Sequence, residues 1–283
     1  MSAAMLRAAA ALALCALLAA CAGGAGPRAA EGVNVIDESD LNEIMLTVAD
    51  PGEAVAHFRR TAAQGPDRIE IRRGLAESLA RDGRADEAVA AWRAVAASPE
   101  ATDADRTALA GALIRTGAWA EARAALDAVP PTYETFERYR FEAMVADSEA
   151  KWDRADSFYE IAAGLTTTPA GVYNNWGFSK LTRGDYAGAE RLFIGALERE
   201  PGLFAAKNNL ALARGAQRRY ELPLVPMSQT ERAQLLHTLA LSAIKQGDVA
   251  TGRALLADAV ETHPQHFEAA ARALAALGGP GGG

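Results

Sequence analysis

The chain has 283 residues, half of them apolar, and its 36 acidic against 29 basic residues give a formal net charge of −7. This acidic balance argues against a nucleic-acid-binding surface, which needs clustered positive charge, so we expect no nucleic-acid partner. Arginine pairs such as Arg218-Arg219 are diluted by acidic neighbours, and we interpret them as solvated helix faces.

The N-terminus has the pattern of an export signal. Arg7 precedes an uninterrupted apolar run from Ala8 to Ala20, which is too short to span a bilayer and is typical of a signal peptide. The run ends at Leu18-Ala19-Ala20-Cys21, which resembles the lipobox of bacterial lipoproteins. The resemblance implies that residues 1–20 are a lipoprotein signal peptide and that Cys21 is lipidated after cleavage. An ordinary signal peptide with an incidental cysteine is the alternative.

The residues after Cys21 indicate where such a lipoprotein would reside. Ala22 stands where lipoproteins retained in the inner membrane commonly carry Asp, so the resemblance favours an outer-membrane lipoprotein facing the periplasm. Residues 21–34 are rich in Gly and Ala without apolar periodicity and indicate a flexible tether. Cleavage would also remove Cys15, so we expect no intrachain disulfide.

From residue 35 onward the sequence predicts a series of paired helices. The first helix is expected near Asp40, with Glu43 completing a capping box and Leu41, Ile44, Met45 and Val48 forming its apolar face. Further along, a small residue recurs at steps of 34, 34, 33, 34 and 63 residues, namely Ala54, Ala88, Ala122, Ala155, Ala189 and Gly252. A large residue follows each after four positions: Phe58, Trp92, Leu126, Tyr159, Phe193 and Leu256. Turn residues precede them as Gly83, Gly117, Ala150, Gly184 and Gly247.

The stretch 170–203 shows the pattern most fully. It predicts two helices with a turn at 183–186 and an end at Pro201. Gly177 and Ala189 allow a close helix approach, and Trp176 and Phe193 are expected to fill the space between the two helices. This order of small and large residues resembles the tetratricopeptide repeat (TPR), whose period is 34 residues. The resemblance implies an all-α TPR helical-hairpin solenoid over 35–277, with a C-terminal capping helix at 267–277 and a disordered tail at 278–283.

One repeat, near 204–232, is irregular. Its first helix is followed by 220–227, where Pro223 and Pro226 disrupt any second helix, and Ser228 and Glu231 then make a capping box. The apolar strap 220–227 has two interpretations: its Leu222, Leu224 and Val225 cover exposed core, or it occupies or gates a binding groove.

Catalytic patterns are missing from the sequence, and we expect neither catalytic residues, nor a cofactor, nor a metal site. It has no Gly-rich phosphate loop, no HExxH and no nucleophile-elbow serine. His263 and His266 straddle Pro264, so they need not share a helix face and a zinc site is not expected there. Acidic residues such as Glu190, Glu198 and Glu200 are expected to be exposed on helix surfaces.

What remains is a binding surface. In a TPR superhelix the fifth position of each first helix points into the concave groove, and here these positions are Arg73, Thr107, Arg140, Asn174, Asn208 and His237. Ninth positions line the same groove and include Met144, Phe178, Leu212 and Leu241. Polar residues are ordinary at solvent-facing positions, but Asn is a poor helix former, which favours a role for Asn174 and Asn208. We therefore predict a peptide-binding site at Arg73, Arg140, Asn174, Phe178, Asn208 and His237.

Three stretches carry a finer resemblance: NNWGFSKLTRGDYAGAERLF, KNNLALARGAQRRY and ERAQLLHTLALSAIKQGD. They resemble the TPR lipoproteins of tight-adherence (Flp-type) pilus systems. This resemblance implies a non-catalytic scaffold that is tethered to the membrane by lipid, binds a protein partner and helps to assemble the outer-membrane secretin in the manner of a pilotin. The alternatives are another cell-envelope scaffold, for barrel assembly or peptidoglycan-synthase regulation, and, least favoured, an enzyme with a hidden site.

Overall fold

The computed structural model describes residues 41–65 and 67–278, and within these ranges every regular element is an α-helix. The predicted all-α fold class is therefore confirmed. The predictions for the signal peptide, Cys21, the tether and the Asp40 cap fall outside the described residues, as does the predicted tail from residue 279. Gly278, which we assigned to that tail, is instead the last residue of a helix. No helix in the described ranges has the length and apolar character needed to cross a bilayer.

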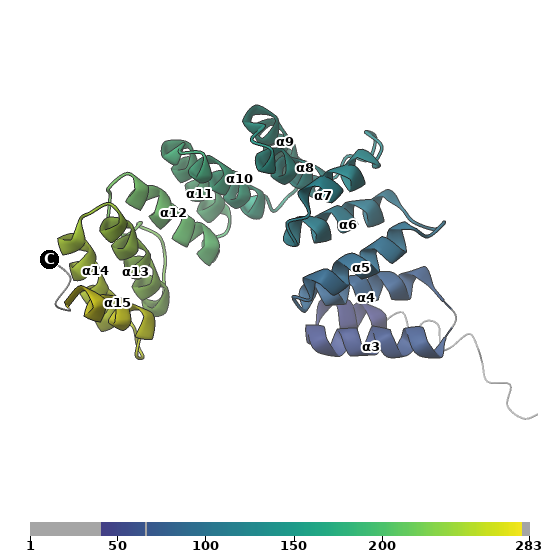
Figure 1. Ribbon diagram of the computed structural model, residues 1–283, viewed down its shortest axis with the longest axis horizontal. Helices are drawn as coiled ribbons and strands as arrows, with labels where there is room; N and C mark the ends of the chain where they lie inside the picture. Colours follow the sequence, from purple (N-terminus) through teal and green to yellow (C-terminus); the bar gives the residue numbers. More distant parts are fainter. Residues whose placement is uncertain (1–40, 66, 279–283) are drawn as a thin grey trace, which may run out of the picture. The chain divides into compact units, whose positions relative to one another are not determined.

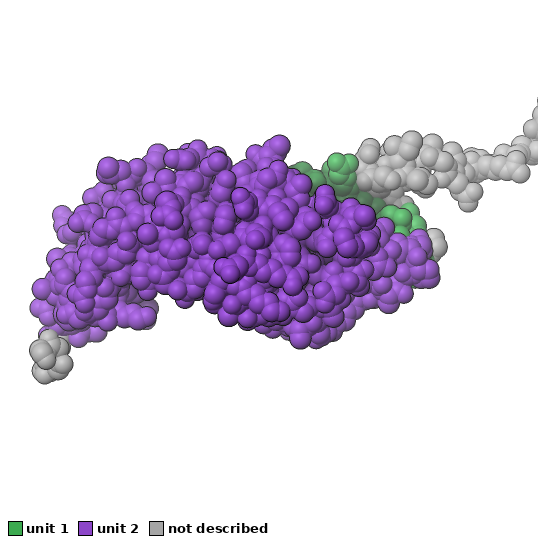
Figure 2. Space-filling view, turned by 90° about the horizontal axis from the view of Figure 1, so that it is seen from above, with its two compact units in different colours: residues 1–84 green, residues 85–283 purple. Residues whose placement is uncertain are grey.

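The chain divides into two compact units, residues 1–84 and 85–283 (Figure 2). In unit 1, residues 41–47 are helical and are followed by α3 Pro51–Gln64 and α4 Ile69–Arg81 (Figure 1). Unit 2 carries α5 Ala85–Ala96, α6 Asp103–Arg115, α7 Trp119–Asp127, α8 Phe136–Ser148, α9 Trp152–Gly164, α10 Ala170–Thr182, α11 Tyr186–Arg199, α12 Phe204–Ala216, α13 Gln229–Lys245, α14 Val249–Thr262 and α15 Glu268–Gly278. Within unit 2, successive helices pack as hairpins, most extensively α8 on α9, α10 on α11 and α13 on α14.

The first helix of unit 1 corrects one prediction. Leu41, Ile44 and Val48 are 41%, 50% and 79% exposed, so the apolar face that we expected them to form is not buried among the described residues. Met45 and the adjacent Leu46 are half-buried instead. The Arg81 guanidinium holds this helix by its C-terminal end, donating to the carbonyls of Met45 at 3.0 Å and Leu46 at 2.6 Å. The unsatisfied carbonyls at the end of this helix thus join it to α4.

The repeat register is confirmed by burial. The marker alanines at 54, 88, 122, 155 and 189 are each 0% exposed, and Gly252 is buried. The large residues four positions later are at most 8% exposed. Small and large residues alternate in this way because each aromatic or aliphatic side chain occupies the volume that a small neighbour leaves free.

The interhelix turns share one backbone conformation. The four predicted turn glycines have φ between 74° and 86°, and Ala150 has φ 56°, in the left-handed region that glycine adopts most easily. Arg218 also has positive φ, at 60°. It lies 34 positions after Gly184 and is therefore the turn residue of the irregular repeat, which the sequence pattern did not reveal.

The hairpin α10–α11 is held by a glycine and an aromatic ring. A Cβ atom at Gly177 would lie 2.6 Å from the Phe193 ring, so only glycine allows this approach. Trp176 does not fill the space between these two helices as expected. It packs against the cluster around Tyr159, with ring centroids 6.2 Å apart, and its indole N–H donates to Asp156 at 2.6 Å. Trp176 therefore joins α10 to the preceding repeat.

The strap replaces a second helix, as predicted, because residues 217–228 contain no helix. Val225 packs on the α11–α12 core, and Leu222 contacts both core clusters of α12 to α15. Leu224 points away from the core and is fully exposed. The core-covering interpretation therefore holds for Leu222 and Val225 but is wrong for Leu224.

Candidate functional site

Two neighbouring pockets lie on unit 2, along the first helices of successive repeats. The first, which we call the aromatic pocket, has a volume of about 480 Å³ and is lined from α7 to α12, by Trp119, Met144, Asp147, Trp152, Tyr159, Asn174, Phe178 and Asn209 among others. The second, the lysine pocket, has a volume of about 620 Å³ and includes Asn208, Leu212, Thr238, Leu241 and Lys245 of α12 and α13. Adjacent residues, Leu181 with Thr182 and Asn208 with Asn209, belong one to each pocket, so the two pockets adjoin.

A chain of side-chain hydrogen bonds links the first helices beneath these pockets. Asn209 donates its amide to Asn174 at 3.0 Å, and Thr238 donates its hydroxyl to Asn208 at 2.8 Å. In both cases the donor is the sixth residue of its first helix, by repeat position, and the acceptor is the fifth-position Asn of the preceding repeat. The bonds use the acceptor oxygens of Asn174 and Asn208, and no described residue accepts from their amide N–H groups.

Asp147 is the acidic residue of the aromatic pocket, and sequence reasoning missed it. Ser179 donates to one carboxylate oxygen at 2.7 Å and Tyr159 to the other at 2.9 Å. Burial raises the pKa of Asp147 above its ordinary value, although both hydrogen bonds act to lower it. The same burial, together with the charge of Asp147, raises the pKa of Tyr159, which keeps its hydroxyl a donor.

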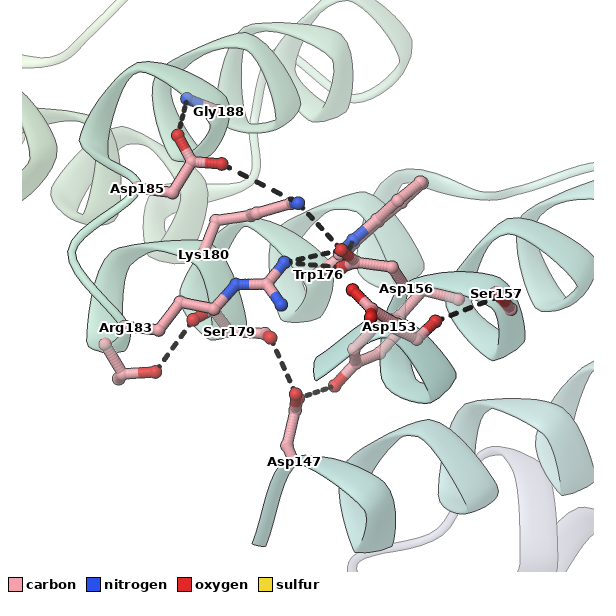
Figure 3. A network of polar contacts seen from close by, with 12 residues as sticks. Asp147, Asp153, Asp156, Ser157, Trp176, Ser179, Lys180, Arg183, Asp185 and Gly188 are labelled. Carbon is pink, nitrogen blue, oxygen red and sulfur yellow. Dashed lines mark hydrogen bonds and ion pairs between the residues drawn. The ribbon is translucent and has the colours of Figure 1, made fainter. Parts of the chain in front are cut away.

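A second carboxylate nearby has a different environment. Figure 3 shows Asp156 receiving Lys180 at 2.8 Å, Trp176 at 2.6 Å and Arg183 at 2.6 Å. Burial raises the pKa of Asp156, but the hydrogen bonds from these three donors outweigh it, so the net effect is a lowered pKa. This ion-pair network joins α9 to α10, and both helices contribute residues to the aromatic pocket.

Comparison with known proteins identifies the fold. No protein-family model matches the chain, and no curated protein matches it significantly. A chain of the APC/C hetero-tetramer Cut9-Hcn1 superposes with a TM-score of 0.60 at 13% identity, over 83% of this chain and 47% of that one. A thermophilic TPR protein of Thermus thermophilus gives 0.53 at 17% identity, over 62% of this chain and 95% of that one. Human IFIT1, solved as a dimer with PPP-AAAA, superposes with a TM-score of 0.56 at 15% identity, over 80% of this chain and 59% of that one.

The chain has the TPR fold. Its helical hairpins, its register of small and large residues and these superpositions agree, and the chain spans about half the length of the Cut9-Hcn1 chain that it matches. Solenoids of this kind stack their hairpins into a superhelix with an extended concave binding surface.

The TPR positions predicted to bind a peptide fall into two groups. Asn174 and Phe178 line the aromatic pocket and Asn208 lines the lysine pocket, together with the ninth-position residues Met144, Leu212 and Leu241. Phe178 is 50% exposed and Leu241 is 46% exposed, so both present apolar surface. These positions are thus brought together on one surface, and peptide binding by them stays a prediction.

The remaining predicted positions lie elsewhere. Arg140 stacks on the Phe141 ring at 4.8 Å, and burial lowers its pKa. His237 lies 5.4 Å from the Phe267 ring, its pKa is lowered by burial, and Thr238 takes its place in the pocket lining. Thr107 is buried and donates to the carbonyl of Asp103 at 2.8 Å within its own helix. Arg73 belongs to unit 1.

One carboxylate that we expected to be an exposed surface group is an inter-repeat contact. The Glu190 side chain is only 14% exposed and accepts a hydrogen bond from Arg214 at 2.9 Å and another from Arg219. Its position in the repeat matches that of Asp156, which pairs with α10 in the same way. The prediction for Glu190 was therefore wrong, because its partners come from the next repeat. Glu198 and Glu200 are exposed as expected.

Proposed function

We propose that this protein is a scaffold whose unit 2 binds an extended segment of a partner protein across the aromatic and lysine pockets. The observation that carries the proposal is the pair of unengaged amide groups, on Asn174 and Asn208, beside apolar pocket walls. Amide N–H groups at successive repeats match the backbone carbonyls of an extended chain, and the apolar walls accommodate its side chains.

Site-specific photo-crosslinking in cells tests this proposal. A photoreactive phenylalanine analogue at Phe178 or Leu241 is expected to give a discrete adduct with a partner protein, and mass spectrometry should locate the crosslink in one short segment of it. Ile194 on α11 is a matched control, because it is 37% exposed but lines neither pocket. Adducts of equal yield from Ile194, or none from the two pocket positions, would reject the groove as the binding surface.

We further propose that the protein is an outer-membrane lipoprotein of a tight-adherence pilus system and that its partner is the secretin or another pilus-assembly subunit. Support comes from the lipobox-like Leu18-Ala19-Ala20-Cys21, from Ala22, and from the three stretches that resemble this lipoprotein family. A lipid-anchored scaffold would raise the local concentration of a captured secretin segment at the membrane. A variant without the lipid would bind its partner without localising it.

Deletion and complementation test this finer proposal. Loss of the protein should reduce secretin multimers in the outer membrane and abolish surface pili while the secretin transcript is unchanged. The wild-type gene should restore both, and Cys21→Ser should not, because it carries no acyl chain. Normal multimers and pili in the deletion strain would favour the alternative, a scaffold for barrel assembly or peptidoglycan synthesis. Acyl label retained on the Cys21→Ser protein would refute the lipidation site.

A further inference from the structure

The aromatic pocket contains one carboxylate, that of Asp147, which forms no ion pair with any described residue. Among the described residues, the hydrogen bonds to Asp147 come from the neutral hydroxyls of Ser179 and Tyr159. Lys180 and Arg183 both bind another carboxylate, Asp156 (Figure 3), although the charge of Arg183 also acts on Asp147. A carboxylate has about four acceptor sites, so two bound hydroxyls leave Asp147 able to accept from a ligand.

The position of Asp147 in the repeat makes this charge unusual. Equivalent positions in the other repeats carry Ala80, Ile114, Leu181, Gly215 and Ile244, which are all apolar or small. Packing alone therefore favours an apolar residue here. Burial also raises the pKa of Asp147, which shows that its charged form is poorly solvated. Asp147 accepts from the buried hydroxyls of Ser179 and Tyr159, and its carboxylate also belongs to the lining of the pocket.

The walls of the pocket are suited to a positively charged group. Its lining includes the aromatic side chains of Trp119, Trp152 and Phe178. Of these, Trp119 is 38% exposed and Phe178 is 50% exposed. Aromatic faces attract cations, most strongly where water is excluded. No Lys, Arg or His lines this pocket, and the nearby Arg183, whose guanidinium lies 5.6 Å from the centroid of the Trp152 ring, is held by Asp156.

We propose that the aromatic pocket binds an arginine or lysine side chain of the partner segment, with Asp147 as the counter-charge and Trp119, Trp152 and Phe178 as the walls. This inference rests on the proposed groove function and specifies which side chain the groove selects. The volume of about 480 Å³ accommodates a guanidinium or ammonium group together with its aliphatic stem. The guanidinium of arginine fits best, because it hydrogen-bonds a carboxylate and stacks on aromatic rings at the same time.

Peptides that differ in one side chain test the proposal on the full mature chain in detergent micelles. The probes are Ac-Ser-Gly-Ala-Xaa-Ala-Gly-Ser-NH₂ with Xaa arginine, lysine, citrulline or glutamate, and the readout is the indole N–H resonances of Trp119 and Trp152. The arginine peptide should shift both resonances saturably and bind about tenfold more tightly than the citrulline peptide, which has the same shape without the charge. The glutamate peptide should bind more weakly still.

Two variants assign the effect to the pocket. Asp147→Asn keeps an acceptor for Ser179 but removes the charge, so arginine and citrulline peptides should bind equally. Asp153→Asn removes a charge at an exposed position of α9 that does not line the pocket, and it should leave the tenfold preference intact. If Asp147→Asn does not fold, Phe178→Leu is the second variant. It removes one half-exposed aromatic wall and should weaken the arginine peptide severalfold.

The proposal is overturned if arginine and citrulline peptides bind the wild type equally, or if millimolar arginine peptide leaves Trp119 and Trp152 unshifted. A preference that survives in Asp147→Asn would overturn it as well. These outcomes are distinct from failure of the groove itself. A discrete Phe178 crosslink without arginine preference would leave the scaffold function standing, whereas loss of that crosslink would remove the groove proposal first.

Discussion

At the scale of single residues, glycines in first helices are required by the rings packed against them. A Cβ atom at Gly177 would lie 2.6 Å from Phe193, and one at Gly74 would lie 2.3 Å from Phe58. Both rings are almost completely buried, and protein interiors leave little free volume into which a ring could move. The repeat therefore depends on the absence of a methyl group at these positions as much as on the presence of the aromatic rings.

Gly177→Ala should lower the free energy of unfolding by about 1–3 kcal/mol, because the added methyl group overpacks the contact with Phe193. Gly171→Ala is the matched control in the same helix, since no atom lies within 4 Å of its added Cβ. That control should be neutral or stabilising by about 0.5–1 kcal/mol, as expected for alanine in place of helical glycine. Urea unfolding of both variants measures the difference. Equal midpoints would place Gly177 away from the ring.

At the scale of helices, each repeat is joined to the next by charges as well as by apolar contacts. Asp156 on α9 binds Lys180 and Arg183, and Glu190 on α11 binds Arg214 and Arg219. In both cases the acid comes from a second helix and the bases from the following repeat. The two acids are only partly exposed, so removing the partners of either would leave a poorly solvated charge, which costs more than the loss of a surface ion pair.

The pKa of Asp156 gives this contact a defined pH dependence. Its folded-state pKa lies below the unfolded value of about 3.9, because three donors outweigh the effect of burial. Asp156 therefore stabilises the fold above the unfolded pKa, and this contribution is lost as pH falls through the folded pKa. Asp156→Asn should cost about 1–3 kcal/mol at pH 7, and the difference from wild type should shrink below about pH 4.

Thermal melts of wild type and Asp156→Asn across pH 2 to 7 measure this effect. Glu160→Gln is the control, because Glu160 is exposed on the same helix and its replacement should change stability by less than about 0.5 kcal/mol. A difference between wild type and Asp156→Asn that grows as the pH falls would contradict the network in Figure 3.

The strap shows that an element without regular structure contributes to the core. Leu222→Ala should destabilise the protein by about 1–3 kcal/mol, because Leu222 contacts the clusters of both Leu239 and Leu256. Leu224→Ala should change stability by less than about 0.5 kcal/mol, because Leu224 is fully exposed. Chemical denaturation distinguishes the two. Equal losses would mean that the strap docks in another register.

At the scale of the whole molecule, a fold built of repeats makes stability local, because within unit 2 the helices pack mainly on their neighbours in the series. Helix α15 covers the last hairpin, where Ala270 is completely buried beside Leu256 and Leu236. Without α15, this apolar surface of α13 and α14 would face water. Helices α8 and α9 do not contribute to this cluster.

Deletion of residues 267–283 should therefore speed hydrogen exchange in α13 and α14 and leave α8 and α9 protected as in the wild type. Hydrogen–deuterium exchange with mass spectrometry resolves these segments. Deletion of residues 279–283 alone is the control, since it keeps all the described helices. Faster exchange throughout unit 2 would indicate a single cooperative core instead of a series of neighbour contacts.

The sequence by itself determined the helices, their turns and the repeat register. The sequence predicts the burial of Ala189 and Phe193 and the left-handed turn at Gly184. Both can be predicted because helix periodicity and turn conformation depend on residues only a few positions apart. The same periodicity placed Asn174, Phe178 and Asn208 on one surface.

Only the tertiary structure decided which groups on that surface are engaged and which are not. Trp176 turns to the preceding repeat, Glu190 is paired by the following one, and Asp147 stays without a counter-charge although Arg183 lies nearby. The sequence does show that Asp147 is acidic where the other repeats have an apolar or small residue. Only the structure shows that this position lines a pocket. The physical reason is distance along the chain. The hydrogen bonds and ion pairs of these residues depend on partners 12 to 32 positions away, and their geometry exists only once the hairpins have formed and stacked.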